Sequence, residues 1–532
     1  MTTKPWIAHW PADVPLNLEY PKIPLYQLVK ESAEAFPSTT AYVFEDERTS
    51  YEQYYTQIER FATVLHSLGV RYTDKVALYL PNIPSYLISY FAVNRIGAIV
   101  VPCNAAYREK EIGFILKDSE AETIIVLEES YPVVENVREE SSLKNVIIVG
   151  KETFPNTLSF SELLSNTESN PPVIDLQSED IAVLGYTGGT TGIPKGALLT
   201  NLNLVSNAIA FTNWFYFEKG KESTIAVLPL THIFGMTCAM TGPFSSAGTV
   251  FLMPKFHPGK LLELISTYKI TYFPCVPTAF IALLHYPELE NFDLNSLRFA
   301  LSGGSSLPVQ VMKEFADKTG VNLLEGYGLT EAAPVTHLSP ITRKKGGSIG
   351  IPIIDIIARV VDDSGKELPI GERGELAIRG PNVMKGYWKK PEETKNTLVN
   401  GELRTGDIAT MDEEGYFFIV DRKKDLINVS GYNVYPRDVE EVLYEHPKVK
   451  TAAAIGVPDE YRGEKVKAYI VLKEGQNATE EEIIKFCEEK IAKFKVPKLV
   501  EFRESLPMTS VGKVLRKSLK EEVNYPTRKG RG

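Results

Sequence analysis

Residues 187–196 combine glycine, threonine and lysine in a pattern that suits the binding of an anion. They read Thr187-Gly188-Gly189-Thr190-Thr191-Gly192-Ile193-Pro194-Lys195-Gly196 and follow an apolar run, residues 181–186, that predicts a buried strand. The four glycines let the backbone approach an anion and point several N–H groups at it. The three threonine hydroxyls can bind phosphate oxygens or a metal, and the lysine adds a cation. We therefore predict a nucleotide-phosphate loop, because an ordinary glycine-rich turn needs neither the threonines nor the lysine.

This loop differs from the Walker A phosphate loop. Walker A requires Gly-Lys followed by Ser or Thr at the start of a helix. Here Pro194 precedes Lys195 and Gly196 follows it. A kinase or motor ATPase of that class is therefore disfavoured.

The elements that must position the loop alternate along the first four hundred residues. Apolar runs predict strands at residues 76–80, 98–102, 226–228 and 250–253, and a helix is expected at residues 83–95. This alternation predicts an α/β fold with βαβ units and parallel sheets.

The pattern restarts on a smaller scale after a charged turn, residues 421–425, which follows a strand-like run. A helix is expected near residues 437–444, strands at 451–456 and 466–472, and a helix at 481–493. The predicted organisation is a large N-terminal ATP- and acyl-binding domain at residues 1–421, a hinge at 422–425 and a small, mobile α+β C-terminal domain at 426–532. The alternative is that the charged turn lies on the surface of one domain.

Composition excludes several other classes of protein. The chain has 532 residues, 43% of them hydrophobic, which is enough for more than one buried core. The net charge of −10, without a strongly basic region, argues against nucleic acid as a partner. Four scattered cysteines favour a reducing cytoplasm over a disulfide framework or zinc site. Residues 235–253 are the most apolar long stretch, but Pro243 and internal glycines favour a buried segment over a membrane span.

Residues 186–196 closely resemble the phosphate loop of the adenylate-forming enzymes, and the form with Gly188 is most similar to fatty acyl-CoA synthetases. Five further segments resemble motifs of that family and stand in the family's order along the chain. They are residues 229–235 (Pro-Leu-Thr-His-Ile-Phe-Gly), 302–308 (Ser-Gly-Gly-Ser-Ser-Leu-Pro), 325–331 (Glu-Gly-Tyr-Gly-Leu-Thr-Glu), 404–407 (Arg-Thr-Gly-Asp) taken together with 421–425 (Asp-Arg-Lys-Lys-Asp), and 507–516 (Pro-Met-Thr-Ser-Val-Gly-Lys-Val-Leu-Arg). A sixth, residues 430–436, resembles the segment that meets CoA.

The resemblance implies roles for particular residues. Lys513, Glu331 and Thr187 would be catalytic, with Glu331 and Thr187 also holding Mg²⁺, which favours carboxylate oxygen shared with phosphates. His232, Met236 and Gly303 would contact the acyl group, and Met236 stands near the place where some long-chain members carry an aromatic gate. Ser430, Gly431 and Tyr432 would contact CoA, and Lys424 would lie at the hinge. ATP or AMP would be bound by Thr187, Gly188, Gly189, Thr190, Thr191, Gly192, Lys195, Gly303, Gly304, Ser305, Glu325, Gly326, Tyr327, Gly328, Thr330, Asp407, Arg422 and Lys513. By the same resemblance, residues 302–308 and Tyr327 would lie at the adenine, and Asp407 and Arg422 would hold the ribose.

The implied activity is an AMP-forming acyl-CoA synthetase with ATP and CoA as co-substrates and Mg²⁺ as cofactor. A medium- or long-chain fatty acid is the expected substrate, which would allow peripheral contact with a membrane. An aryl-CoA ligase, or another adenylate-forming enzyme with a non-fatty carboxylate, is the alternative. A luciferase-like oxygenase and a non-catalytic nucleotide sensor are further alternatives, although Lys513 and Glu331 argue against a sensor. Chain length, oligomeric state and the conformation of the hinge do not follow from the sequence.

Overall fold

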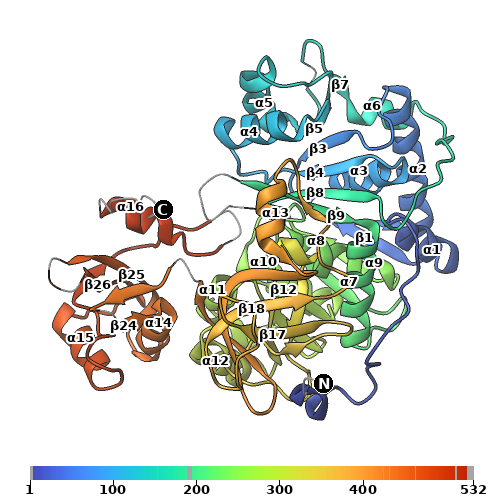
Figure 1. Cartoon of the computed structure of the whole chain (residues 1–532). Coiled ribbons are helices and arrows are strands. Elements are labelled where there is room, and N and C mark those ends of the chain that lie inside the picture. Colours follow the sequence, from blue (N-terminus) through green and yellow to red (C-terminus); the bar gives the residue numbers. More distant parts are fainter. Residues whose placement is uncertain are drawn as a thin grey trace.

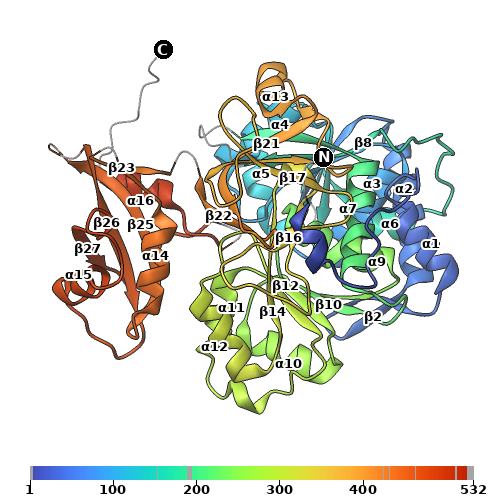
Figure 2. The ribbon, with the colours of Figure 1, turned by 60° about the horizontal axis from the view of Figure 1, so that its bottom comes forward.

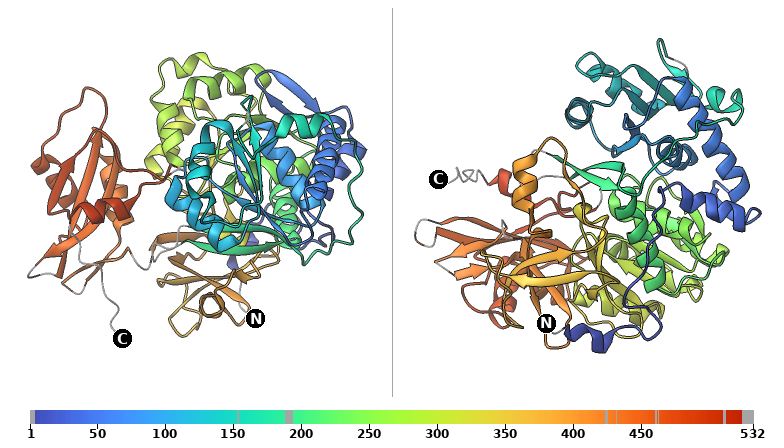
Figure 3. Two further views of the ribbon diagram at one scale, coloured as in Figure 1. Left: turned by 90° about the horizontal axis from the view of Figure 1, so that it is seen from above. Right: turned by 45° about the vertical axis from the view of Figure 1, so that its right-hand side comes forward.

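The architecture is described from a computed structural model that covers residues 4–152, 154–187, 194–422, 425–430, 432–459, 461, 463–509 and 512–523. Within these residues the chain forms a large N-terminal domain and a smaller C-terminal domain (Figure 1). The C-terminal domain, coloured orange to red, lies to one side of the large domain. The view from above separates the two in the same way (Figure 3, left).

One sheet of the large domain carries the segments predicted to face adenine and the acyl group. Its central strands are parallel and its two edges are antiparallel. In spatial order the strands are β16 (Ile351–Pro352), β15 (Val335–Leu338), β14 (Leu323–Gly328), β13 (Phe299–Ser302), β12 (Tyr272–Cys275), β10 (Ser223–Ala226), β11 (Thr249–Leu252), β1 (Thr40–Phe44) and β2 (Glu47–Ser50).

A second sheet carries the base of the phosphate loop. In spatial order its strands are β19 (Gly386–Tyr387), β9 (Lys195–Thr200), β8 (Ile181–Thr187), β4 (Ile99–Pro102), β3 (Lys75–Tyr79), β5 (Thr123–Leu127), β6 (Asn145–Val149) and β7 (Leu158–Ser159). The strands from β8 to β7 pair in parallel, whereas β8 and β9 form an antiparallel pair. The predicted βαβ unit at residues 76–102 is confirmed, because α3 (Pro84–Arg95) connects β3 to β4.

Helices pack on these sheets (Figure 2). They are α1 (Gln27–Ala35), α2 (Tyr51–Ser67), α4 (Glu109–Ser119), α5 (Tyr131–Arg138), α6 (Phe160–Ser165), α7 (Asn201–Trp214), α8 (Ile233–Met236), α9 (Gly242–Ser245), α10 (Pro258–Tyr268), α11 (Pro277–Leu284), α12 (Val309–Thr319) and α13 (Pro391–Thr397). Helix α2 begins at Ser50, whose side chain accepts from the N–H of Gln53 while the Gln53 side chain accepts from the N–H of Ser50. This reciprocal cap satisfies two amide groups that a helix start leaves without partners.

The predicted strand at residues 226–228 is wrong in position, because β10 ends at Ala226. The buried amide of Asn82 donates to the carbonyls of Ala226 and Leu228 at 2.7 and 2.9 Å, and its oxygen accepts from the N–H of Leu230. The Asn82 side chain therefore provides the hydrogen-bond partners that a neighbouring strand would otherwise have provided for these backbone groups.

A third sheet, which the sequence pattern did not predict, follows the two large ones. Its strands are β17 (Ile357–Val361), β18 (Gly374–Arg379), β21 (Glu402–Met411), β20 (Leu398–Val399) and β22 (Phe417–Arg422), and they pair antiparallel. The predicted charged turn at residues 421–425 needs correction, because Asp421 and Arg422 still belong to β22, paired with Ile408 and Asp407.

The C-terminal domain is the small α+β unit that the sequence predicts. Its strands are β24 (Tyr432–Val434), β23 (Ile427–Val429), β26 (Gly463–Leu472), β25 (Val449–Asp459) and β27 (Leu499–Phe502), with helices α14 (Pro436–Glu445), α15 (Glu480–Glu488) and α16 (Arg516–Glu522). Helix α15 is shorter than predicted. After Glu488 the helix ends, and the N–H groups of Lys490 and Ile491 both donate hydrogen bonds to the carbonyl of Cys487.

The most apolar stretch, residues 235–253, is a buried part of the large domain, as predicted. It contains α8, one turn of π-helix (Thr237–Thr241), α9 and β11. Among the described residues, no helix has the length and apolarity to cross a membrane. All four cysteines are buried thiols.

Candidate active site

The predicted phosphate loop connects β8 to β9, so the ends of these two strands at Thr187 and Lys195 form its base. Thr187 and Lys195 face each other across the two strands, and the Thr187 hydroxyl donates to the Lys195 carbonyl at 3.4 Å. The loop residues Gly188, Gly189, Thr190, Thr191 and Gly192 lie outside the described residues. The described ends of β8 and β9 at Thr187 and Lys195 therefore lie side by side at the base of the predicted loop.

Glu331, the predicted metal ligand, lies beside this hairpin. It belongs to a single 3-10 turn, Thr330–Ala332, that follows β14. A side chain at Gly185 would contact the methyl group of Thr330 at 3.1 Å, so the turn packs directly on β8. The Glu331 Oε1 atom accepts a 2.7 Å hydrogen bond from the Tyr387 hydroxyl. Burial and this carboxylate raise the pKa of Tyr387, which keeps the phenol protonated as a donor.

The donor set at this corner fits Mg²⁺ held jointly by protein and phosphate. Glu331 supplies a half-buried carboxylate and Thr187 a hydroxyl. Within the described residues, no group of three or more His, Cys, Asp and Glu side chains could hold a metal by itself. Mg²⁺ commonly binds through one or two carboxylates and takes its other ligands from phosphates and water.

The predicted ribose-binding residues form a connected group. Asp407 on β21 lies opposite Arg422 on β22, with 3.5 Å between Asp407 Oδ1 and Arg422 Nε. The Tyr327 hydroxyl at the end of β14 donates to Asp407 Oδ2 at 2.6 Å. This contact joins the adenine-side strand to the third sheet, so the proposed adenine and ribose contacts lie together.

The predicted glycines here are required by packing. A side chain at Gly303 would meet the Phe234 ring at 3.0 Å, and one at Gly328 would meet the Pro334 carbonyl at 2.3 Å. A side chain at Gly326 would likewise meet the Leu338 side chain at 2.6 Å. Ser305, in the same loop as Gly303, is exposed. These glycines thus leave the backbone at the ends of β13 and β14 uncovered by their own side chains, and neighbouring groups pack closely against it.

Glu325, predicted to bind nucleotide, is buried away from solvent. Its Oε1 atom accepts from the N–H of Leu307 at 3.1 Å. Burial raises its pKa to about 7, with Arg437 and the Leu307 N–H opposing the shift. These contacts are structural, and its role at the nucleotide stays a prediction.

Lys513 lies within the large domain's site, although it belongs to the C-terminal domain. A side chain at Gly304 would meet Lys513 Cε at 3.2 Å. Its turn is held by the Thr278 hydroxyl of α11, which donates to the Gly512 carbonyl at 3.0 Å. Desolvation lowers the pKa of Lys513 to about 8, Arg422 adds to the shift, and Asp407 opposes it. The ammonium therefore remains mainly charged at neutral pH.

His232, on the predicted acyl side, lies close enough to Lys513 for the ammonium charge to affect the pKa of its ring. Its Nδ1 atom accepts from the N–H of Phe234 at 3.3 Å and caps α8. Burial and the Lys513 charge lower the pKa of His232 to about 3, so the ring is neutral. Met236 is buried at the end of the same short helix. The next turn is π-helical, an irregularity that is frequent near functional sites.

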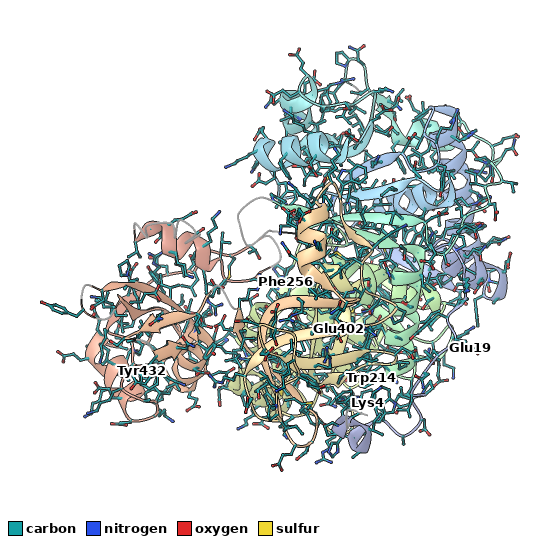
Figure 4. All side chains as sticks on the ribbon, in the orientation of Figure 1. Lys4, Glu19, Trp214, Phe256, Glu402 and Tyr432 are labelled. Atoms are coloured by element: carbon teal, nitrogen blue, oxygen red, sulfur yellow. The ribbon has the colours of Figure 1, made fainter. Side chains whose placement is uncertain are left out.

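The residues predicted to meet CoA are not brought to this site. Ser430 and Tyr432 are exposed on the C-terminal domain, where the Tyr432 ring stacks on Phe494 at 4.8 Å between centroids. Figure 4 shows Tyr432 on that domain, on the side of the molecule away from most of the large domain. Gly431 and the predicted hinge residue Lys424 lie outside the described residues.

The sequence motifs did not identify two residues that hold parts of the candidate site in place. Tyr387 contacts Glu331, and Thr278 holds the Gly512 carbonyl. Neither residue has a local pattern that distinguishes it, because its partner is more than fifty positions away in the chain.

Two family models match the chain over both domains. One, described as AMP-binding enzyme, matches residues 29–388, and the other, described as AMP-binding enzyme C-terminal domain, matches residues 438–513. The chain therefore belongs to the AMP-binding enzyme family.

Individual relatives span almost the whole chain. A long-chain-fatty-acid–CoA ligase of Bacillus subtilis (strain 168) is 41% identical, with 98% of each chain covered. The anthranilate CoA ligase AuaEII in complex with anthranoyl-AMP has a TM-score of 0.89 at 29% identity, covering 96% of this chain and 98% of its own. ATP-bound MatB from Rhodopseudomonas palustris has a TM-score of 0.88 at 30% identity, covering 95% of this chain and 100% of its own.

Proposed function

We propose that this protein is an ATP-dependent acyl-CoA synthetase that activates a medium- or long-chain fatty acid through an acyl-AMP intermediate. The observation that carries the proposal is the position of Lys513, whose side chain lies beside Gly304 and close enough to interact electrostatically with His232 at the acyl side and with Asp407 at the ribose side. A cation between a carboxylate site and a nucleotide site suits the joining of two anions. The 41% identity to a long-chain-fatty-acid–CoA ligase supports the class of acid.

In the first step, a carboxylate oxygen attacks the α-phosphorus of ATP. A carboxyl–phosphate bond forms, the bond from the α-phosphorus to the bridging oxygen breaks, and pyrophosphate leaves. Because both reactants are negative, electrostatic stabilisation should dominate this step. Lys513 is placed to hold the two reactants and compensate their charge, while Lys195 and Thr187 face the leaving phosphates. Mg²⁺, held by Glu331 and Thr187, would neutralise phosphate charge when bound.

In the second step, the thiol of CoA attacks the acyl carbon of acyl-AMP. The thioester bond forms, the acyl–oxygen bond to phosphate breaks, AMP leaves and the thiol proton is released. Ser430, Gly431 and Tyr432 are the residues we assign to CoA. Since they do not face the Lys513 site here, this step requires the C-terminal domain to rotate about residues 422–425.

The proposed acid and acceptor can be tested together. Pyrophosphate release and CoA-dependent AMP release would be measured with short-, medium- and long-chain fatty acids and with anthranilate. We expect the highest kcat/KM with a medium- or long-chain fatty acid and production of its acyl-CoA. A maximum with anthranilate would make the protein an aryl-CoA ligase, and pyrophosphate release without CoA consumption would refute the synthetase.

A cytoplasmic location and peripheral contact with membranes are part of the same proposal. They rest on the expected fatty substrate and on the four unpaired buried cysteines. Fractionation of cells, with a salt wash of the membrane pellet, would test both.

A further inference from the structure

The side chain of Tyr387 lies between the two charged groups that the proposed function assigns to phosphate and metal. Its hydroxyl donates to Glu331 Oε1 at 2.7 Å. The ammonium of Lys195 lies over its ring, 5.2 Å from the centroid. One phenol therefore contacts the metal-side carboxylate through its edge and the phosphate-side cation through its face.

The backbone around Tyr387 is fixed to both partners. Strand β19 pairs with β9, with Tyr387 opposite Ala197, and the N–H of Trp388 donates to the Gly196 carbonyl at 2.8 Å. On the other side, the N–H of Met384 donates to the Glu331 carbonyl at 2.8 Å. The segment around Tyr387 is thus a strap that ties the turn carrying Glu331 to the base of the phosphate loop.

The N–H of Tyr387 itself is also fixed, because it donates to the Thr394 hydroxyl of α13 at 2.9 Å. Gly386, with φ of +149°, allows that helix to approach, since a side chain there would meet Thr394 at 2.8 Å. The ring is therefore held from its own backbone as well as from its two contacts. Such support limits the number of side-chain positions that Tyr387 can adopt.

These contacts have two chemical consequences. A hydrogen bond to Oε1 orients the Glu331 carboxylate and leaves Oε2, which has no hydrogen-bond partner within the described residues, for a cation. The ring also stands between Lys195 and Glu331, which form no ion pair with each other in the described part of the chain. If the two charges met directly, each would neutralise the other and weaken its attraction for cation or phosphate.

We propose that Tyr387 is a positioning residue that holds the Glu331 carboxylate ready for a divalent cation and keeps Lys195 apart from it. The proposal rests on the proposed function, because that function assigns Glu331 to the metal and Lys195 to phosphate. Residues that orient a metal ligand typically change metal affinity by about 10- to 100-fold when removed. The Tyr387 hydroxyl should contribute at the lower end of that range, because it contacts one oxygen of one ligand.

The chain contains a matched control for the hydroxyl. Tyr55, in α2, is also half-buried and also donates to a carboxylate, Glu59 Oε1, at 2.9 Å. Both Tyr55 and Glu59 lie in α2, outside the predicted site. Tyr387→Phe and Tyr55→Phe therefore each remove a phenol hydroxyl that donates to a carboxylate, the first beside Glu331 and the second away from the site.

The experiment measures Mn²⁺ binding to the full chain by electron paramagnetic resonance, with ATP present and no carboxylic acid. We expect Tyr387→Phe to weaken Mn²⁺ binding about 10-fold and Tyr55→Phe to change it less than about twofold. ATP binding without a divalent cation should be unchanged in Tyr387→Phe, because the ring over Lys195 remains. Tyr387→Leu, which also removes the ring, should weaken ATP binding even without the cation.

Wild-type Mn²⁺ affinity in Tyr387→Phe, or an equal loss in Tyr55→Phe, would overturn the proposal. Failure of the wild-type chain to bind Mn²⁺ together with ATP would instead refute the metal site of the proposed function. Magnesium titration of pyrophosphate release gives a second readout. The Tyr387→Phe variant should need about 10-fold more Mg²⁺ and then recover most of its rate.

Discussion

Two faces of the C-terminal domain differ in what they contact. The face that carries Lys513 is bound to the large domain, with Gly512 held by Thr278 and Lys513 packed beside Gly304. The face that carries Tyr432 is exposed, and the Tyr432 ring stacks on Phe494 of its own domain. Both faces belong to one small sheet domain, so they cannot serve one site in the same orientation.

The bound face also uses helix α14, which lies against α12 and β22 of the large domain (Figures 1 and 2). Glu441 of α14 accepts from the N–H of Val309, at the start of α12, at 3.4 Å. Arg437 donates to the carbonyls of Ile419 and Gly347 at 2.6 and 3.0 Å. Most of these contacts are polar, which suits an interface that must form and release. Under the proposed mechanism, this arrangement would serve the first step and the exposed face would serve the second.

The largest expected difference between the faces comes from Lys513→Ala. Loss of one charge-stabilising group in a preorganised site typically lowers kcat about 100- to 1,000-fold. We expect that loss in acyl-AMP formation, measured as pyrophosphate release, while conversion of supplied acyl-AMP to acyl-CoA changes little. The control is Lys517→Ala, an exposed lysine four positions away. Equal losses in both half-reactions, with the fold intact, would contradict the two-face mechanism.

Tyr432→Ala should give the opposite pattern. Removing one aromatic contact costs about 1 to 1.5 kcal/mol, which corresponds to roughly 10-fold in apparent CoA affinity. The KM for CoA should rise in the second half-reaction, and pyrophosphate release should stay unchanged. Tyr461→Ala provides the control, because that ring is 95% exposed on the same domain. A rise in the KM for ATP instead would place Tyr432 at the nucleotide.

Gly512→Ala tests the bound face without removing a charge. Its φ is +77°, and an added side chain would meet Val276 at 3.0 Å and Thr278 at 3.1 Å across the interface. We expect about a fivefold loss of pyrophosphate release, from about 1 kcal/mol of crowding in the bound orientation. Gly475→Ala is the matched control, since its φ is +71° and nothing lies within 4 Å. The same loss in both variants would mean that backbone strain, rather than contact between domains, causes it.

The smallest expected effect is on the pH dependence of stability, through Glu325. Burial raises its folded-state pKa to about 7, above the ordinary value of 4.5, so the native state keeps a proton that the unfolded state loses. This group therefore lowers stability as pH rises from about 4.5 to 7, with the full cost present above 7.

Glu325→Gln removes that cost and keeps an acceptor for the N–H of Leu307. The melting temperature of the variant, relative to wild type, should rise by one to a few degrees between pH 5 and pH 8. Differential scanning calorimetry would measure it, with exposed Glu488→Gln as the control. A difference that does not change with pH would show that Glu325 is ionised in the folded protein.

The candidate site could be proposed from the sequence because its motifs are local. The loop at residues 187–196 and the segment at 325–331 combine residue types whose chemistry is apparent without neighbours. The strands and helices around them also follow apolar periodicity, as in the unit β3–α3–β4. The apolar periodicity did not predict the third sheet, because its antiparallel strands do not alternate with helices in the βαβ pattern.

The sequence by itself determined the class of chemistry, because a glycine- and threonine-rich segment, an acidic residue and a lysine near the C-terminus stand in the order of one family's motifs. Only the tertiary structure decided which of these groups meet. Tyr387 reaches Glu331 and Lys195 because β19 pairs with β9, although almost two hundred residues separate those strands. The Lys513 turn reaches Thr278 because the C-terminal domain binds on α11 and α12. Such contacts depend on sheet order and domain placement, and these arise from the packing of whole surfaces rather than from any short run of residues.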